Sequence, residues 1–146
     1  MLAKLLVALL LMALCVVIHA VGLTAAVHRL RRVATSLPLS FQRSVGVLIT
    51  IAAWAILLHL LQIAVWALFY ALHHGMPDLP TALYFSAVTY TTTGYGDLVL
   101  PPEWRLVGGV EALTGILMCG LSTGFFFAVL SKTFESASTA DRETRP

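Results

Sequence analysis

Charged residues are scarce in this sequence: 9 Lys and Arg and 7 Asp and Glu make up only 11% of its 146 residues. Soluble domains carry about 25% charged residues, so the composition excludes an ordinary water-soluble globule. The formal net charge of +2 is too small to indicate nucleic acid as a partner. Both cysteines, Cys15 and Cys119, lie in apolar runs, which argues against the disulfide framework of a secreted domain. With 59% hydrophobic residues and room for one domain, the chain is predicted to be a membrane protein.

Charge is almost absent from three long segments. Residues 5–27 and 44–77 contain no charged side chain, and residues 106–131 contain one, Glu111. About 20 helical residues cross a hydrocarbon core that is roughly 30 Å thick, and a helix satisfies its own backbone polar groups in lipid. We therefore predict three transmembrane helices, over residues 1–27, 45–72 and 105–133.

Lysine and arginine are concentrated on one side of these helices. Residues 28–43 form a basic connection and residues 135–146 a polar tail, whereas residues 44–104 contain neither Lys nor Arg. The positive-inside rule predicts a multi-pass protein of the cell membrane, with its N-terminus outside and the basic connection and C-terminal tail in the cytoplasm. The basic cluster is expected to contact anionic lipid headgroups. A cleaved signal peptide is the alternative for the first segment, although its apolar run is longer than usual.

Residues 80–97, PTALYFSAVTYTTTGYGD, are too polar and too short to span a membrane. Pro80 suits a first helical turn, so we predict a short helix over residues 80–91. Gly94 and Gly96 follow a run of three threonines, and the helix cannot continue through them. Irregular backbone at membrane depth is tolerated only where protein buries it or where it lines a watery cavity. The pattern predicts a re-entrant helix with a returning strand over residues 92–97.

The two glycines in this strand have a physical role. Consecutive carbonyls point the same way only if alternate residues take opposite backbone hands, and glycine adopts the left-handed values at little cost. Gly94 and Gly96 would let the carbonyls of Thr92, Thr93, Gly94 and Tyr95 face one axis. Rings of such oxygens replace the hydration shell of a cation.

The heptapeptide TTTGYGD resembles the selectivity filter of the potassium channel family, in which four loops of the TVGYG type form the filter. An outer helix, a pore helix, the filter and an inner helix follow in the family's order over residues 44–134, and Gly115 and Gly120 are similar to its gating hinge. The resemblance implies an all-α membrane fold: three transmembrane helices, with a re-entrant pore helix and filter loop, in a homotetrameric pore. It also implies passive K⁺ conduction without a cofactor, with K⁺ bound in the filter by Thr92, Thr93, Gly94, Tyr95 and Gly96.

Filter support is expected from the aromatic residues Tyr84 and Phe85, which could pack with Tyr95 as a cuff, and from Asp97. The chain departs from the family at Val88. A well-known bacterial channel has a glutamate there, bonded to the aspartate that corresponds to Asp97, which puts that channel's mode of filter inactivation in doubt here.

Glu111 is the one charged residue within the apolar segments 5–27, 44–77 and 106–131, and such a residue is a functional candidate by default. It could lie behind the filter and bond the pore helix, for instance at Thr89 or Tyr90, substituting for the missing glutamate. Alternatively, it could reach the outer interface or pair with Arg105.

Other residues within the spans have simpler interpretations. Trp66, Phe69 and Tyr70 cluster near the outer end of the second helix, where aromatic residues commonly anchor a helix at the interface. His19 and His59 have no Cys, Asp or Glu at ligand spacing, so no metal site is expected there.

Potassium conduction has competitors of other classes. A weakly selective cation channel is one, although the complete GYG argues against it. A non-conducting regulatory membrane subunit is another. An enzyme is the most distant alternative, because the chain lacks a nucleophile–base pair.

Overall fold

Four helices make up the regular structure of the described chain. The computed structural model describes the backbone of residues 2–34 and 41–143 and the side chains of residues 2–30, 42 and 45–131. The helices are α1 (Leu2–Ala34), α2 (Phe41–Leu72), α3 (Leu79–Tyr90) and α4 (Arg105–Glu143). Segments long and apolar enough to cross a membrane are Leu2–Leu30, Val45–Leu72 and Arg105–Ser131. The predicted all-α fold with three transmembrane helices is confirmed.

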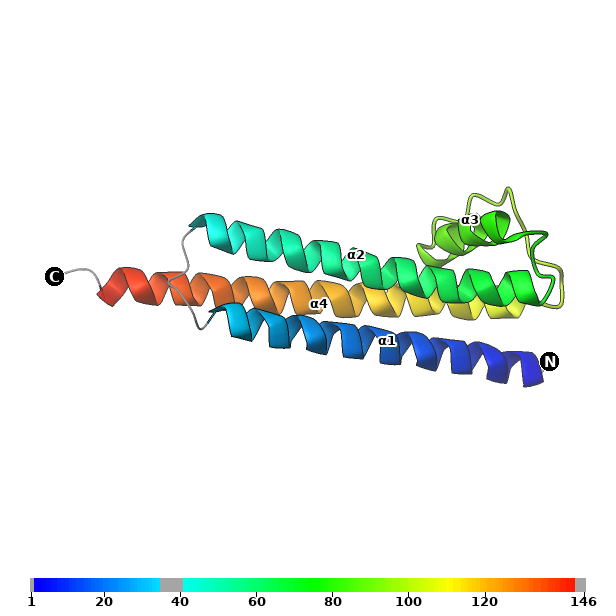
Figure 1. Cartoon of the computed structure of the whole chain (residues 1–146). Coiled ribbons are helices and arrows are strands. Elements are labelled where there is room, and N and C mark those ends of the chain that lie inside the picture. The colour runs from blue at the N-terminus through cyan, green and yellow to red at the C-terminus, as the bar shows by residue number, and fades with distance from the viewer. Residues whose placement is uncertain (1, 35–40, 144–146) are drawn as a thin grey trace.

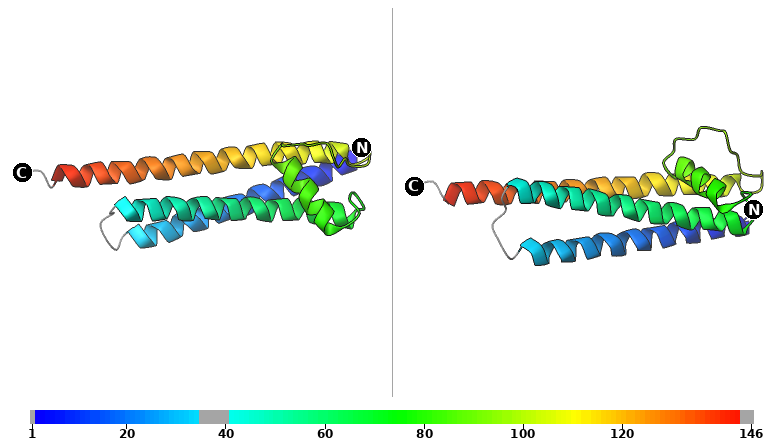
Figure 2. Two further views of the ribbon diagram at one scale, coloured as in Figure 1. Left: turned by 90° about the horizontal axis from the view of Figure 1, so that it is seen from above. Right: turned by 45° about the horizontal axis from the view of Figure 1, so that its top comes forward.

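The three long helices lie side by side, and α3 packs at one end of the bundle against α2 and α4 (Figures 1 and 2). α1 and α4 run in the same direction, and α2 runs against both. The N-terminal end of α1 therefore lies at the same end as α3 and the loop after it, whereas the C-terminal end of α4 lies at the opposite end (Figure 1). The N-terminal end of α1 and the C-terminal end of α4 are therefore at opposite ends of the bundle, as predicted. Which of these ends faces the outside of the cell stays a prediction.

The long helices extend beyond the predicted bilayer segments. α1 continues to Ala34 and α2 begins at Phe41, so the basic connection predicted over 28–43 is helical at both ends; residues 35–40 lie outside the described residues. α4 continues to Glu143, through most of the polar tail predicted over 135–146. The bilayer fixes the length of the apolar run, whereas a helix that has formed propagates beyond it at little cost.

The start of α3 is set by its own sequence. Asp78 is the N-cap, and its side chain accepts a hydrogen bond of 2.8 Å from the backbone N–H of Thr81. This hydrogen bond lowers the pKa of Asp78. Pro80 lies in the first turn, where a missing N–H costs nothing. α3 thus spans Leu79–Tyr90, shifted by one residue from the predicted 80–91.

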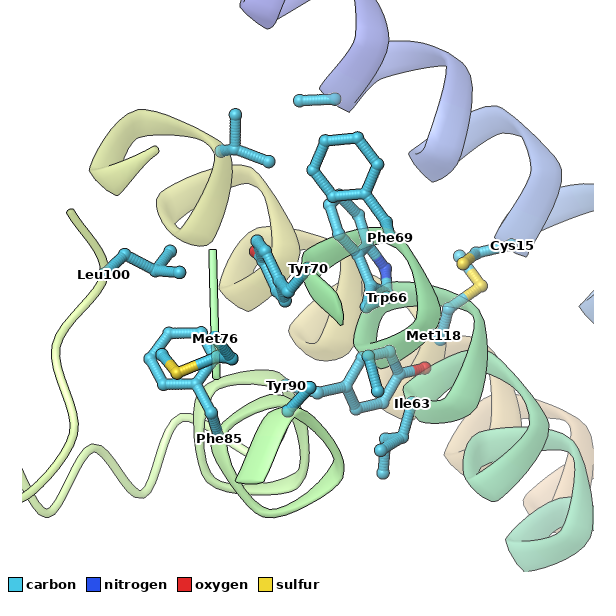
Figure 3. Close-up of a cluster of buried hydrophobic side chains, with 14 residues drawn as sticks. Cys15, Ile63, Trp66, Phe69, Tyr70, Met76, Phe85, Tyr90, Leu100 and Met118 are labelled. Atoms are coloured by element: carbon cyan, nitrogen blue, oxygen red, sulfur yellow. The ribbon is translucent and has the colours of Figure 1, made fainter. Parts of the chain in front are cut away.

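A core of aromatic side chains fills the bundle where α3 meets the long helices (Figure 3). Trp66 and Tyr70 are fully buried and Phe69 is 7% exposed. The rings of Phe69 and Tyr70 lie edge to face at 5.5 Å, as do those of Tyr70 and Phe85 at 5.4 Å. The prediction that the α2 aromatics only anchor the helix at the interface is wrong, because they pack between helices instead of facing outward.

Two glycines allow helices to approach closely. A Cβ added at Gly115 of α4 would overlap the backbone carbonyl of Tyr90, the last residue of α3. A Cβ added at Gly22 of α1 would overlap the side chain of Leu58 in α2, and the indole N–H of Trp54 donates a 2.9 Å hydrogen bond to the Gly22 carbonyl. Small residues at such crossings are typical of helix packing in membranes.

Replacing Gly115 by alanine should destabilise the fold, because backbone rather than a flexible side chain meets the new methyl group. Overpacking typically costs about 1–3 kcal/mol. Gly120→Ala is the matched control on α4: no atom lies within 4 Å of the added Cβ, and the better helix propensity of alanine should raise stability by up to about 1 kcal/mol. Unfolding of both variants in detergent micelles tests this, and equal stabilities would contradict the close approach of α4 to Tyr90.

Candidate functional site

The candidate site is the segment that follows α3, residues 91–97, here called the filter segment. Its first residues fold back on the last turn of α3. The N–H groups of Thr93 and Gly94 donate to the carbonyl of Val88 at 3.0 and 3.2 Å, and the N–H of Thr92 donates to the carbonyl of Thr89 at 2.9 Å. The filter segment is therefore hydrogen-bonded directly to the C-terminal end of α3 and is not separated from it by a free linker.

Alternate residues of the filter segment take the left-handed backbone conformation. Gly94 has φ 55° and Gly96 has φ 77°, as the glycine spacing predicts. Thr92 also has a positive φ, 59°, which its residue type does not predict because threonine rarely adopts this conformation. Extending the two-residue period backward from the glycines would have found it. The alternation at 92, 94 and 96 is the backbone pattern that lets successive carbonyls point the same way.

The filter segment has little cover within one chain. Every residue from 91 to 97 is exposed, including Tyr95, which is 71% exposed. The hydroxyls of Thr91 and Thr93 lie 2.9 Å apart and form a hydrogen bond. A single chain therefore supplies only one side of a binding site and does not enclose it.

Tyr84 and Asp97, two of the residues expected to support the filter, are hydrogen-bonded to each other. The Tyr84 hydroxyl donates a hydrogen bond of 2.7 Å to Oδ2 of Asp97, and this bond raises the pKa of Tyr84. Phe85 points the other way, into the core against Tyr70. The cuff of Tyr84, Phe85 and Tyr95 stays a prediction.

Glu111 is completely buried behind α3, but its partner is not one that the sequence suggests. Its Oε2 accepts a hydrogen bond of 2.9 Å from the hydroxyl of Tyr70 in α2. The named partners are wrong: Glu111 does not bond Thr89 or Tyr90, and Arg105 donates to the carbonyl of Leu100 instead. Glu111 does lie against α3, where it interacts with Ser86.

The register of α4 explains the choice of partner. Gly115 occupies the position beside Tyr90, so Glu111, one helical turn earlier, lies closer to the loop end of the bundle. There it is level with Tyr70 and with the hydroxyl of Ser86. The second carboxylate oxygen of Glu111 and the Ser86 hydroxyl are buried without a partner in ordinary hydrogen-bond geometry, and they lie close enough to interact with each other.

The expected hinge residues differ in their surroundings. α4 is continuous through both Gly115 and Gly120. Gly115 is required by the approach to Tyr90, whereas the space around Gly120 is open. A hinge at either glycine stays a prediction.

A cluster of hydrogen-bonded polar side chains in the middle of the bundle is not predicted by the sequence. We call it the polar ring, and its members are His19, His59, Gln62, Tyr90 and Ser122. Polar residues in otherwise apolar spans were the available signal, but their mutual contacts depend on how the helices are rotated. Among the described residues, no group of three or more His, Cys, Asp or Glu side chains could hold a metal ion.

Substitutions at Glu111 should separate its hydrogen bond from its charge. Glu111→Gln keeps an oxygen that accepts from Tyr70 and should retain stability, whereas Glu111→Leu leaves the buried Tyr70 hydroxyl unpaired at a cost of about 1–3 kcal/mol. Adding Tyr70→Phe to Glu111→Leu should recover most of that loss. Unfolding in micelles measures all three variants.

Thr114→Val is the matched control, since the Thr114 hydroxyl is equally buried but bonds only the Val110 carbonyl of its own helix. A Glu111→Leu variant as stable as the wild type and Thr114→Val would contradict the pairing with Tyr70.

Comparisons with known proteins cover this part of the chain. A family model described as "Ion channel" matches residues 46–132, more than half of the chain. The potassium voltage-gated channel protein Shal of Drosophila melanogaster is 35% identical over 68 residues, which are 44% of this chain and 12% of that protein. The potassium voltage-gated channel protein shk-1 of Caenorhabditis elegans is 47% identical over 45 residues, 30% of this chain and 8% of that protein. The chain thus spans only a small part of the length of these relatives. No solved structure matches the chain significantly.

The matched region contains the filter segment and the helices on both sides of it. The assignment therefore rests on the part of the chain that carries the candidate site. Membership of a channel family confirms the prediction that the protein is not an enzyme. The chain belongs to the ion channel family, and its resemblance to the potassium channels is confirmed.

Proposed function

We propose that four copies of this chain form a pore that conducts K⁺ passively and selectively across the cell membrane. The observation that carries the proposal is the left-handed conformation at alternate residues of the filter segment, at Thr92, Gly94 and Gly96. Such a backbone presents successive carbonyl oxygens to one axis, and rings of carbonyls can replace the hydration shell of an ion.

Assembly of several copies is supported by the exposure of the filter segment in a single chain. The filter segment is exposed along its whole length, and the large ring of Tyr95 is 71% exposed. A cation that loses its water needs oxygens on all sides, and one chain supplies a single strand of them. A homotetramer around the filter segments would enclose the ion and cover Tyr95.

Ion binding is assigned to the carbonyls of Thr92, Thr93, Gly94 and Tyr95, with Gly96 permitting the turn that follows. The C-terminal end of α3 immediately precedes these residues and carries the negative end of its helix dipole, which favours a cation nearby. The N-terminus and the loop around α3 would lie outside the cell, and the C-terminal end of α4 in the cytoplasm, as the distribution of Lys and Arg indicates.

Reconstitution of the purified chain in liposomes, with K⁺ and Na⁺ gradients in opposite directions, tests selectivity. The reversal potential should lie near the K⁺ equilibrium value. Gly94→Ala should abolish selective flux, because alanine is strained at φ 55°. Thr93→Val is the matched control: it keeps the carbonyl and the side-chain shape, and it should preserve the reversal potential.

Two results would reject the proposal. A reversal potential midway between the K⁺ and Na⁺ values would indicate a weakly selective cation channel. Absence of flux from the purified chain, together with its isolation in a complex with another channel protein, would indicate a regulatory subunit.

The bond between Tyr84 and Asp97 should support the conducting filter. Tyr84→Phe removes the donor and should lower K⁺ flux several-fold, whereas Asp97→Asn keeps an acceptor oxygen and should have the smaller effect. Because the pKa of Tyr84 is raised, the bond should persist through the neutral range and be lost only at strongly alkaline pH, above the ordinary tyrosine value of about 10. Flux recorded over that pH range would refute the support role if Tyr84→Phe matched the wild type throughout.

A further inference from the structure

The polar ring joins all four helices in the middle of the bundle. His19 of α1 and Gln62 of α2 are fully buried, and Tyr90 at the end of α3 is 1% exposed; His59 of α2 and Ser122 of α4 are half-buried. Five hydrogen bonds of 2.7 to 3.1 Å connect these side chains in a closed loop. Buried polar networks in which every member is satisfied specify one arrangement of the core.

The donors and acceptors around the ring can be assigned completely. Tyr90 donates to Oε1 of Gln62, so its oxygen accepts from Nδ1–H of His59. The free Nε2 of His59 then accepts from Ser122, and Ser122 accepts from Nε2–H of His19. The remaining nitrogen, Nδ1 of His19, accepts from the amide of Gln62, which closes the ring in one direction.

Both imidazoles are neutral in this arrangement, one protonated on Nδ1 and the other on Nε2. Reversing the Gln62 amide, which coordinates alone do not distinguish, reverses every bond. Each imidazole then still carries one proton, and the two tautomers are still different. The ring therefore has five donors for five acceptors and no place for an additional proton.

An extra proton on either imidazole breaks the ring. On His19, it would set two donors face to face at Gln62, or at Ser122 if the amide is reversed. On His59, it would set two donors face to face at Ser122, or at Tyr90 if the amide is reversed. In each case one proton of the ring loses its acceptor. Histidine is the side chain whose ordinary pKa, about 6.5, lies in the physiological range.

The other titratable groups around the ring do not replace its bonds. The rings of His19 and His59 lie 5.3 Å apart, so two added protons would repel each other. Cys15 of α1 and Cys119 and Glu111 of α4 are the other titratable groups near Tyr90. Glu111 bonds the hydroxyl of Tyr70 rather than an imidazole.

We propose that the polar ring is a proton-binding site that controls the pore. When both imidazoles are neutral, the loop of hydrogen bonds is intact and the pore conducts. A proton on either imidazole breaks the loop and lowers ion flux. The proposal rests on the proposed function. The hydroxyl of Tyr90 is held from two sides by the ring, and the filter segment begins at the next residue. Breaking the ring loosens the C-terminal end of α3. The carbonyl oxygens of the filter segment, which must fit the ion, then also lose their fixed positions.

K⁺ flux through the full chain in phosphatidylethanolamine–phosphatidylglycerol vesicles should fall several-fold between about pH 7.5 and about pH 5, across the histidine range. Tyr90→Phe removes two ring bonds, so its flux at neutral pH should already be as low as that of the acidified wild type and should change little with pH. Ser122→Ala should behave in the same direction. Wild-type flux that is independent of pH, or full flux with an intact acid response in Tyr90→Phe, would overturn the proposal.

Two controls locate the response. Thr123→Val removes a hydroxyl from the residue next to Ser122 that bonds only its own helix at Cys119, and it should leave flux and acid response unchanged. Replacing His73 and His74 in the exposed outer loop by glutamine should do the same. Loss of the acid response in the His73 and His74 variant would assign it to the outer loop and contradict the ring.

Nitrogen NMR of the imidazoles in bilayers tests the ring without ion flux. With signals assigned through His19→Gln and His59→Gln, the two residues should show one Nδ1–H and one Nε2–H neutral tautomer near pH 7.5, and a charged imidazole on acidification. Two identical tautomers, or no change with acid, would overturn the ring as a proton site. Absence of K⁺ flux at every pH would instead reject the proposed function and the control of flux, while these signals still decide whether the ring binds protons.

Discussion

The docking of Tyr90 fixes the position of the candidate site. α3 is too short to span a membrane, so its depth in the bundle depends on contacts at its inner end. There the Tyr90 carbonyl lies against Gly115 of α4, and the Tyr90 hydroxyl donates to Gln62 of α2. Because the backbone N–H groups that follow bond back to the last turn of α3, any shift of Tyr90 is passed to the filter segment.

Features governed by local chemistry could be predicted from the sequence. The absence of charge defines the spanning helices, since lipid excludes charged side chains and unpaired backbone groups. Pro80 and the glycines at 94 and 96 define the short helix and the strand, because each restricts or permits particular backbone angles. Thr92 shows the limit of this reasoning: its positive φ follows from the alternation of the strand and not from its own preference.

Contacts between helices could not be predicted, and the reason is the uniform composition of the spans. A helix that is apolar all round has no polar face to show which side is buried. Whether Trp66 faces lipid or the core, and whether Glu111 meets α2 or α3, depends on helix rotation, which residues far apart in the chain determine together. Tyr70 and Glu111 are 41 positions apart. Buried polar residues are the remaining clue, since they are costly in lipid unless they face one another.

This cost also explains how α1 is held against the helices that the family model matches. The family match begins at residue 46, so α1 lies outside it, yet α1 packs against both α2 and α4. Lipid tails are as apolar as leucine, so burial of apolar surface does not drive helices together in a bilayer. Close packing at Gly22 and the hydrogen bonds of His19 are what specify its place. Since the bonds of His19 lead to Gln62 and Ser122, the same interactions that position α1 also connect it to the helices around the filter.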